Sequence, residues 1–75
     1  MSGQIIARIR KANDAEIRVT LKEYKGRAVV DVRVWYVPAG VPDYVATKKG
    51  LTFDVDKLPE LADALAQAVK LANVG

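Results

Sequence analysis

Two alternating segments, separated by one Lys-Gly pair, constrain the fold of this chain more than any other feature. Apolar residues occupy every second position across residues 16–23, and the alternation resumes across residues 27–37. A period of two that is rich in β-branched residues predicts half-buried strands. Because Lys25-Gly26 leaves room only for a tight turn, the two strands are predicted to form an antiparallel hairpin.

Each predicted strand has an apolar side and a polar side. The apolar sides carry Ile17, Val19 and Leu21 in the first strand and Ala28, Val30, Val32 and Val34 in the second. The polar side of the second strand carries Arg27, Asp31, Arg33 and Trp35. We expect Asp31 to face a cation across the strands rather than to act in catalysis. Tyr36 has the parity of the apolar side, which would place it under a covering helix unless the strand bulges.

Shorter elements are predicted on both sides of the hairpin. Residues 5–11 form either a short strand or an ordered basic arm, and Asn13-Asp14 marks a turn. The elements predicted after the hairpin are a loop at 38–43, a short strand at 44–47, a basic corner at Lys48-Lys49-Gly50 and a last short strand at 51–53. The chain is thereby divided into an N-terminal arm or strand at residues 1–15 and a domain at residues 16–75.

The C-terminal segment predicts a helix whose apolar surface is too wide for one sheet to cover. Its polar residues form a narrow stripe at helical spacing, and Asp54 or Asp56 is expected to cap its start, with Pro59 in the first turn. We therefore predict a homodimer through paired helices, each also lying on its own sheet. The side chains assigned to this interface are Leu61, Leu65, Ala68, Val69 and Ala72.

Composition excludes several classes of site. The 75 residues include neither Cys nor His, so disulfides, thiolate metal sites and histidine chemistry are ruled out. The Asp54-Val55-Asp56 carboxylates have no legible catalytic partner, and no phosphate-binding loop is present, so neither an enzyme nor a cofactor is expected. A net charge of +3 favours a polyanionic partner. No signal peptide or membrane-spanning segment is expected.

Three motifs resemble one family in their order and spacing. The first is residues 16–27, with the sequence EIRVTLKEYKGR; the second is the VDVRVWY run at 30–36; the third is the TKKGLT run at 47–52. Together with the Leu-x-x-Ala-Leu pattern in the helix, they are similar to the transcriptional positive coactivator family (positive cofactor four) over about residues 16–72.

This resemblance implies an α+β fold: a four-stranded, curved antiparallel sheet followed by one C-terminal helix, dimerising through the helices. It also implies sequence-independent binding of single-stranded DNA by the β-ridges of both subunits, in transcription regulation or in replication and repair. The protein would be cytoplasmic and associated with the nucleoid in a prokaryote, and it would be nuclear in a eukaryote.

Carried over by position, the resemblance assigns DNA contacts to basic and aromatic residues along the hairpin and the third motif. The chemistry of strand binding, which combines cations with aromatic faces, adds Trp35 to this set. The complete candidate set is Lys22, Tyr24, Lys25, Arg27, Arg33, Trp35, Tyr36, Lys48 and Lys49. Which of the two adjacent aromatics, Trp35 or Tyr36, stacks on a base is left open.

The sequence also departs from the family pattern. Val45 and Ala46 replace a common Lys-Pro pair, and no acidic, Ser-rich tail precedes the domain, which favours a bacterial or phage member. Two alternatives stay open: a protein-interaction adaptor of the transcription machinery, and a binder of melted duplex or RNA.

The placement of the remaining charges is also predicted. Cations at positions 8, 10 and 11 are expected to solvate an edge rather than to extend the binding surface. Six of the nine acids are expected to lie outside that surface; they are Asp14, Asp43, Asp54, Asp56, Glu60 and Asp63.

Overall fold

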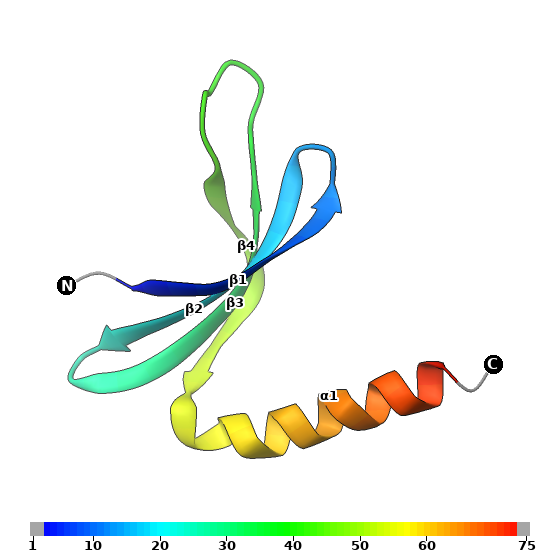
Figure 1. Ribbon diagram of the computed structural model, residues 1–75. Helices are drawn as coiled ribbons and strands as arrows, with labels where there is room; N and C mark the ends of the chain where they lie inside the picture. Colours follow the sequence, from blue (N-terminus) through cyan, green and yellow to red (C-terminus); the bar gives the residue numbers. More distant parts are fainter. Residues whose placement is uncertain (1–2, 74–75) are drawn as a thin grey trace.

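The computed structural model describes residues 3–73, so the outermost positions of the predicted ranges 1–15 and 16–75 lie outside the described residues. Four antiparallel strands form one open, curved sheet in the order β1-β2-β3-β4, and a helix follows (Figure 1). The elements are β1 (Gln4–Ala12), β2 (Ala15–Tyr24), β3 (Arg27–Tyr36), β4 (Val45–Asp54), the 3-10 turn η1 (Val55–Lys57) and α1 (Leu58–Ala72). The predicted α+β class, a four-stranded curved antiparallel sheet followed by one helix, is confirmed; pairing through the helices stays a prediction.

The N-terminal segment forms a full strand at one edge of the sheet. β1 pairs antiparallel with β2, and its register shifts twice, between Ile5 and Ala7 and between Arg10 and Ala12. Of the two possibilities left open for residues 5–11, the strand is therefore correct. The predicted domain boundary between residues 15 and 16 stays a prediction, because strand pairing alone does not define a domain limit.

The hairpin of β2 and β3 has the predicted geometry. Its pairing runs without a register shift from Ala15 opposite Tyr36 to Tyr24 opposite Arg27. Lys25 and Gly26 connect the strands with φ angles of 52° and 77°. Two consecutive residues with positive φ are typical of the tight hairpin turn whose twist matches that of the strands.

Residues 45–54 form one continuous strand, so the basic corner predicted at Lys48-Lys49-Gly50 is wrong. The pairing of β3 with β4 is irregular at this point instead: Arg33 pairs with Gly50, whereas Trp35 pairs with Ala46. The Thr47 hydroxyl donates to the Val34 carbonyl at 2.8 Å and accepts from the Lys49 N–H at 3.1 Å. At Gly50 a Cβ atom would lie 2.6 Å from the Val32 carbonyl oxygen, so glycine is needed here for close strand approach rather than for a turn.

The pairing registers divide the sheet into two faces. One face, called here the apolar face, includes Ile17, Val19, Leu21, Val30, Val32, Val34, Leu51 and Phe53. The opposite face, called here the polar face, includes Arg8, Arg10, Glu16, Arg18, Lys22, Tyr24, Arg27, Asp31, Arg33 and Trp35. Among residues 3–73, only Val29 and Val30 are buried apolar side chains. The protomer therefore leaves most of its apolar face uncovered.

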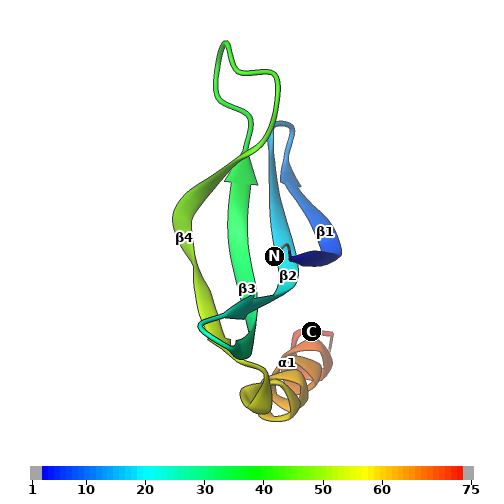
Figure 2. The same cartoon turned by 90° about the vertical axis from the view of Figure 1, so that its left-hand side faces the viewer.

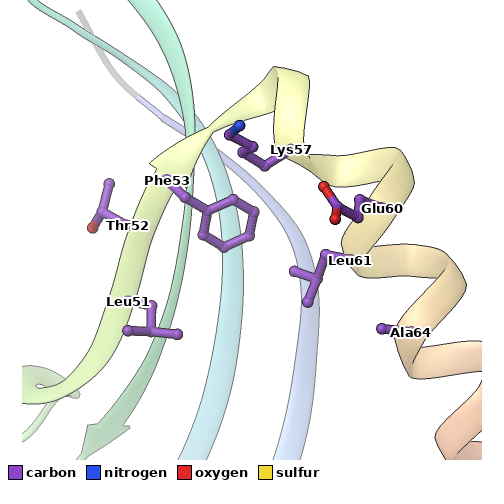
Figure 3. Close-up of a pocket in the computed structure, with 7 residues that line it drawn as sticks. All are labelled: Leu51, Thr52, Phe53, Lys57, Glu60, Leu61 and Ala64. Atoms are coloured by element: carbon purple, nitrogen blue, oxygen red, sulfur yellow. The ribbon is translucent and has the colours of Figure 1, made fainter.

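The helix leaves the sheet instead of covering it, which corrects the expectation that each helix lies on its own sheet. η1 redirects the chain at the end of β4, and α1 then extends past the end of the strands (Figures 1 and 2). Only the first turns approach β4: Phe53 and Leu61 project into a shared groove, whereas Thr52 points away (Figure 3). The side chains of Leu65 and Val69 stay 58% and 60% exposed.

Asp54, one of the two predicted caps, does occupy the N-cap position of η1, but its carboxylate makes no capping hydrogen bond. Neither Asp54, which precedes η1, nor any other side chain makes a capping hydrogen bond at the start of η1 or α1. The Asp54 carboxylate is instead paired with Arg27. Pro59 does lie in the first turn of α1, as predicted. Within residues 3–73, no helix is long and apolar enough to cross a membrane.

Candidate nucleic-acid interface

The candidate set is built mainly on the polar face, where arginines and lysines have different surroundings. Within residues 3–73, four arginines form ion pairs with carboxylates, at positions 8, 18, 27 and 33. None of the described lysines forms such a pair, and neither does Arg10. The lysines in the candidate set thus keep their charge available for a ligand, whereas Arg27 and Arg33 share theirs with an acid.

The first group of candidates lies at the β2–β3 hairpin tip. Tyr24 is 59% exposed, and the Lys25 Nζ atom lies 5.3 Å from its ring centroid. Arg27 stands directly opposite Tyr24, and Lys22 is one position along the same face of β2. Arg27 is ion-paired with Asp54, so this acid lies on the polar face beside a candidate contact and not outside the candidate surface, contrary to the prediction. The tip combines an exposed ring with the cations of Lys22 and Lys25.

Arg33 lies at the centre of a hydrogen-bond network. Its guanidinium donates to the Asp31 carboxylate at 2.8 and 3.1 Å, to the Thr47 carbonyl at 3.0 Å and to the Thr52 hydroxyl at 3.4 Å. Asp31 therefore has its cation partner, but on its own strand; across the sheet it accepts from the Thr52 hydroxyl at 2.7 Å. Burial alone would raise the pKa of Asp31, yet the hydrogen bonds from Arg33 and Thr52 outweigh it and lower that pKa.

The two adjacent aromatics differ in what covers them. The guanidinium of Arg18 lies 4.4 Å from the Trp35 ring, and the indole Nε1 is buried without a hydrogen-bond partner in the described structure. Tyr36 lies at the end of β3 on the apolar face and is 39% exposed. The helix is at the opposite end of the strand, so Tyr36 is not under it (Figure 1). Tyr24 and Tyr36 are thus exposed, whereas Trp35 is half-buried and has a guanidinium over its ring.

Lys48 and Lys49 form the remaining group. Both are exposed in the irregular part of β4, beside the β3 positions occupied by Arg33 and Trp35. Arg33 and Thr47 hold this part of the strand through the hydrogen bonds described above. The structure therefore separates the candidates into three groups: the hairpin tip, the second half of β3 with Arg33, Trp35 and Tyr36, and the two lysines of β4.

A cluster that the sequence did not predict joins β1, β2 and the β3–β4 loop. Arg8 donates two hydrogen bonds to the Glu16 carboxylate, at 2.8 and 3.1 Å, and Arg18 donates to the same group. Hydrogen bonds from Arg8 lower the pKa of Glu16, although desolvation opposes them. Both guanidinium groups also lie near the Tyr44 ring, at 5.6 and 5.0 Å. The alternating pattern predicted that Glu16 and Arg18 lie on one side of the strand. It could not predict that Tyr44 joins them, because Tyr44 lies in a loop and loops have no periodic pattern.

The comparisons with known proteins identify the relatives of this chain. Residues 11–64 match the family model described as transcriptional coactivator p15 (PC4), which is more than two thirds of the chain. The chain belongs to the PC4 family. This match spans β2, β3, β4 and the first turns of α1, and it includes every candidate DNA contact.

Solved structures of PC4 homologues agree with this assignment. A PC4 homologue from Burkholderia pseudomallei is 32% identical, with a TM-score of 0.80 over 91% of this chain and 98% of that chain. A homologue from bacteriophage T5, described as implicated in recombination-dependent DNA replication, is 21% identical; its TM-score of 0.78 over 99% of this chain and 84% of that chain supports the fold. The chain is thus a PC4-like protein of the bacterial or phage type. No curated protein sequence matches it.

Proposed function

We propose that this protein binds single-stranded DNA without sequence preference, as a homodimer, in transcription or in replication and repair. The observation that carries the proposal is the hairpin tip, where the exposed Tyr24 ring lies beside Lys22 and Lys25, two cations without a carboxylate partner in the described structure. Single strands are held by cations along the phosphates and by aromatic faces on the bases. Membership of the PC4 family supports the same role, as does the implication of the phage T5 homologue in DNA replication.

The uncovered apolar surface supports the homodimer. The apolar face of the sheet and the outer side of α1 are both exposed in the protomer, and Leu51 is 70% exposed. Burying a Leu or Val side chain contributes about 1.5–3 kcal/mol, so leaving these surfaces in water would forfeit a large part of the stability of a 75-residue chain. A second copy covers such a surface with its own, because a two-fold interface is self-complementary.

The proposed activity is binding without catalysis. The described carboxylates of the polar face are each neutralised by arginine, and the lysines of that face make no carboxylate pair. A surface of this kind is suited to holding a polyanion in place.

Equilibrium binding tests this function. Labelled oligo-dT, duplex DNA and RNA of equal length are titrated with the full chain by fluorescence anisotropy at two salt concentrations. We expect tighter binding to oligo-dT than to duplex, with affinity falling as salt rises. Equal affinity for duplex and single strand would refute the proposal, and a preference for RNA would reassign the ligand.

The role of Tyr24 is tested separately. Tyr24→Leu keeps an apolar side chain but removes the aromatic face, so oligo-dT affinity is expected to fall about fivefold to 150-fold, which corresponds to roughly 1–3 kcal/mol per stacked base. Tyr24→Phe is the matched control and should bind nearly as the wild type does. If Tyr24→Leu binds as well as Tyr24→Phe, Tyr24 does not stack on a base.

A further inference from the structure

A polar hollow lies on the polar face at the end opposite the hairpin tip. It is open, encloses about 410 Å³, and is formed by β1, the β1–β2 turn, β2 and the β3–β4 loop. Its polar walls come from Arg8, Arg10, Asn13, Glu16 and Tyr44, none of which belongs to the candidate set described above. We refer to it as the Arg10 hollow.

The charges in the Arg10 hollow leave an excess of positive potential. The Glu16 side chain is only 8% exposed, and both of its oxygens accept hydrogen bonds from Arg8, while Arg18 adds a third. One carboxylate is thus balanced by two guanidinium groups. Arg10 adds a further cation, whose single described contact is a long one of 3.4 Å to the Asn13 side-chain oxygen. A contact of this length is weak, so Arg10 retains nearly all of its donors for a ligand.

The hollow is held in shape before any ligand arrives. Glu16 fixes Arg8 through two parallel hydrogen bonds, and the Tyr44 ring lies against both Arg8 and Arg18 at 5.6 and 5.0 Å. Restricting these long side chains in the free protein lowers the entropy cost of binding. A fixed guanidinium with unused N–H groups is suited to the oxygens of a phosphate.

The position of the hollow fits the path of a bound strand. Arg10 stands opposite Glu16, and Arg8 stands opposite Arg18, on the same face as Tyr24 and Lys22. From Tyr24 to Glu16 the strand spans about 26 Å, at roughly 3.3 Å per residue. A DNA strand that lies along the polar face from the hairpin tip therefore reaches the Arg10 hollow after about 26 Å.

We propose that the Arg10 hollow binds one backbone phosphate of the single strand, with Arg10 and Arg8 as its donors. This inference rests on the proposed function and extends the DNA contacts to β1. From the sequence alone, the cations of β1 are expected only to solvate an edge of the sheet. In this proposal, Tyr24 and lysines contact the bound DNA at the hairpin tip, and arginines contact it at the opposite end of the polar face.

The test compares two variants that each remove one exposed cation. Arg10→Gln changes the hollow, and Lys70→Gln changes the polar stripe of α1, away from the sheet. With oligo-dT of about twelve nucleotides, Arg10→Gln is expected to weaken binding about tenfold and to reduce the slope of log affinity against log salt by about 0.7. Lys70→Gln should leave the slope unchanged, and Arg10→Lys should restore most of it.

Three outcomes separate this inference from the proposed function. If the wild type binds oligo-dT but Arg10→Gln and Lys70→Gln bind equally, the inference is wrong while the function stands. If the wild type does not bind oligo-dT, sodium phosphate is titrated into the ¹⁵N-labelled chain at constant ionic strength, with chloride as the control. A saturable shift of the Arg10 Nε–H signal would then keep the hollow as a site for free phosphate, and its absence would overturn the inference.

Discussion

At the scale of single residues, the polar face divides its cations between two tasks. Arg8 and Arg27 form ion pairs that join two strands, and Arg18 and Arg33 form ion pairs within their own strands. Arg10 and the lysines Lys22, Lys25, Lys48 and Lys49 make no carboxylate pair in the described structure. The planar guanidinium can bridge a carboxylate and a carbonyl at once, as Arg33 does, and an ammonium group cannot match that fork. Exchanging the two residue types would therefore disturb both the sheet and the ligand surface.

The clearest residue-scale prediction concerns Asp31 and acid stability. Its pKa is lowered in the folded state from an ordinary value of 3.8, so its contribution is present above that pH and is lost as the pH falls through the lower, folded pKa. Asp31→Asn is expected to lower the free energy of unfolding by roughly 2–4 kcal/mol at pH 7, because Arg33 loses its charged partner. Urea unfolding at several pH values measures this.

The control for this experiment is Asp63→Asn, which removes a carboxylate from the exposed side of α1. It should change stability by no more than about 0.5 kcal/mol. The difference between wild type and Asp31→Asn should shrink as the pH falls below 3.8. A difference that stays constant down to acid pH would show that the carboxylate charge of Asp31 does not stabilise the fold.

Residue roles were only partly predictable from the sequence. Alternation alone placed Arg27, Arg33 and Trp35 on one side, and the registers confirm it. It does not reveal that Asp54 and Asp31 neutralise these arginines, or that Arg18 covers the indole of Trp35. Such contacts depend on strand register and rotamers, which periodicity does not specify.

At the scale of elements, the residue at position 25 of the hairpin turn affects both the stability of the turn and the charge beside Tyr24, in opposite directions. Lys25 has a φ of 52°, a conformation that costs a non-glycine residue roughly 1–2 kcal/mol and that Asn tolerates better. A lysine at this position thus lowers hairpin stability while presenting a cation beside Tyr24. This combination is expected where function, rather than turn propensity, selects the residue.

Replacing this lysine should therefore separate stability from binding. Lys25→Asn is expected to raise the free energy of unfolding by about 0.5–1 kcal/mol and to weaken oligo-dT binding several-fold, because one phosphate contact is lost. Thermal unfolding and anisotropy measure the two effects. Lys22→Asn is the control on regular β2, where binding should weaken without a gain in stability. Stabilisation with unchanged affinity would exclude Lys25 from the interface.

Element types were predicted better than their ends. The hairpin follows from alternation because strand sides differ in polarity, but β4 was divided in two by Lys48-Lys49-Gly50, a run that is typical of turns. In the structure, Gly50 serves close strand approach, and the irregular pairing accommodates the lysines within one strand. A glycine required by a neighbouring backbone cannot be told from a turn glycine by sequence alone.

At the scale of the whole molecule, the helix and sheet of one protomer remain largely separate. The breadth of the apolar helix surface was visible in the sequence, and the structure leaves that surface exposed. The prediction that part of this helix surface packs on the protomer's own sheet was wrong. The sequence shows how much apolar surface must be buried, but not which chain buries it. The proposed dimer then makes stability depend on protein concentration.

The proposed dimerisation through the helices can be tested by mutation. Val69→Glu places a charge in the predicted interface, and sedimentation should shift the protein from dimer to monomer, with a lower melting temperature. Gln67→Glu adds the same charge on the polar stripe and should sediment as the wild type does. Dimers that persist in Val69→Glu to the same extent as in Gln67→Glu would contradict pairing through the helices.

The three residues of η1 are the whole connection between the sheet, which is proposed to bind DNA, and the helix, which is proposed to form the dimer. In the proposed dimer, their conformation would therefore fix the angle between each sheet and the paired helices. In a dimer, that angle determines how far apart the two polar faces stand and in which relative direction two bound strands would run. Lengthening this link by one residue would alter the spacing between the strands without touching any nucleotide contact, so η1 is the place where the geometry of the assembled complex is tuned.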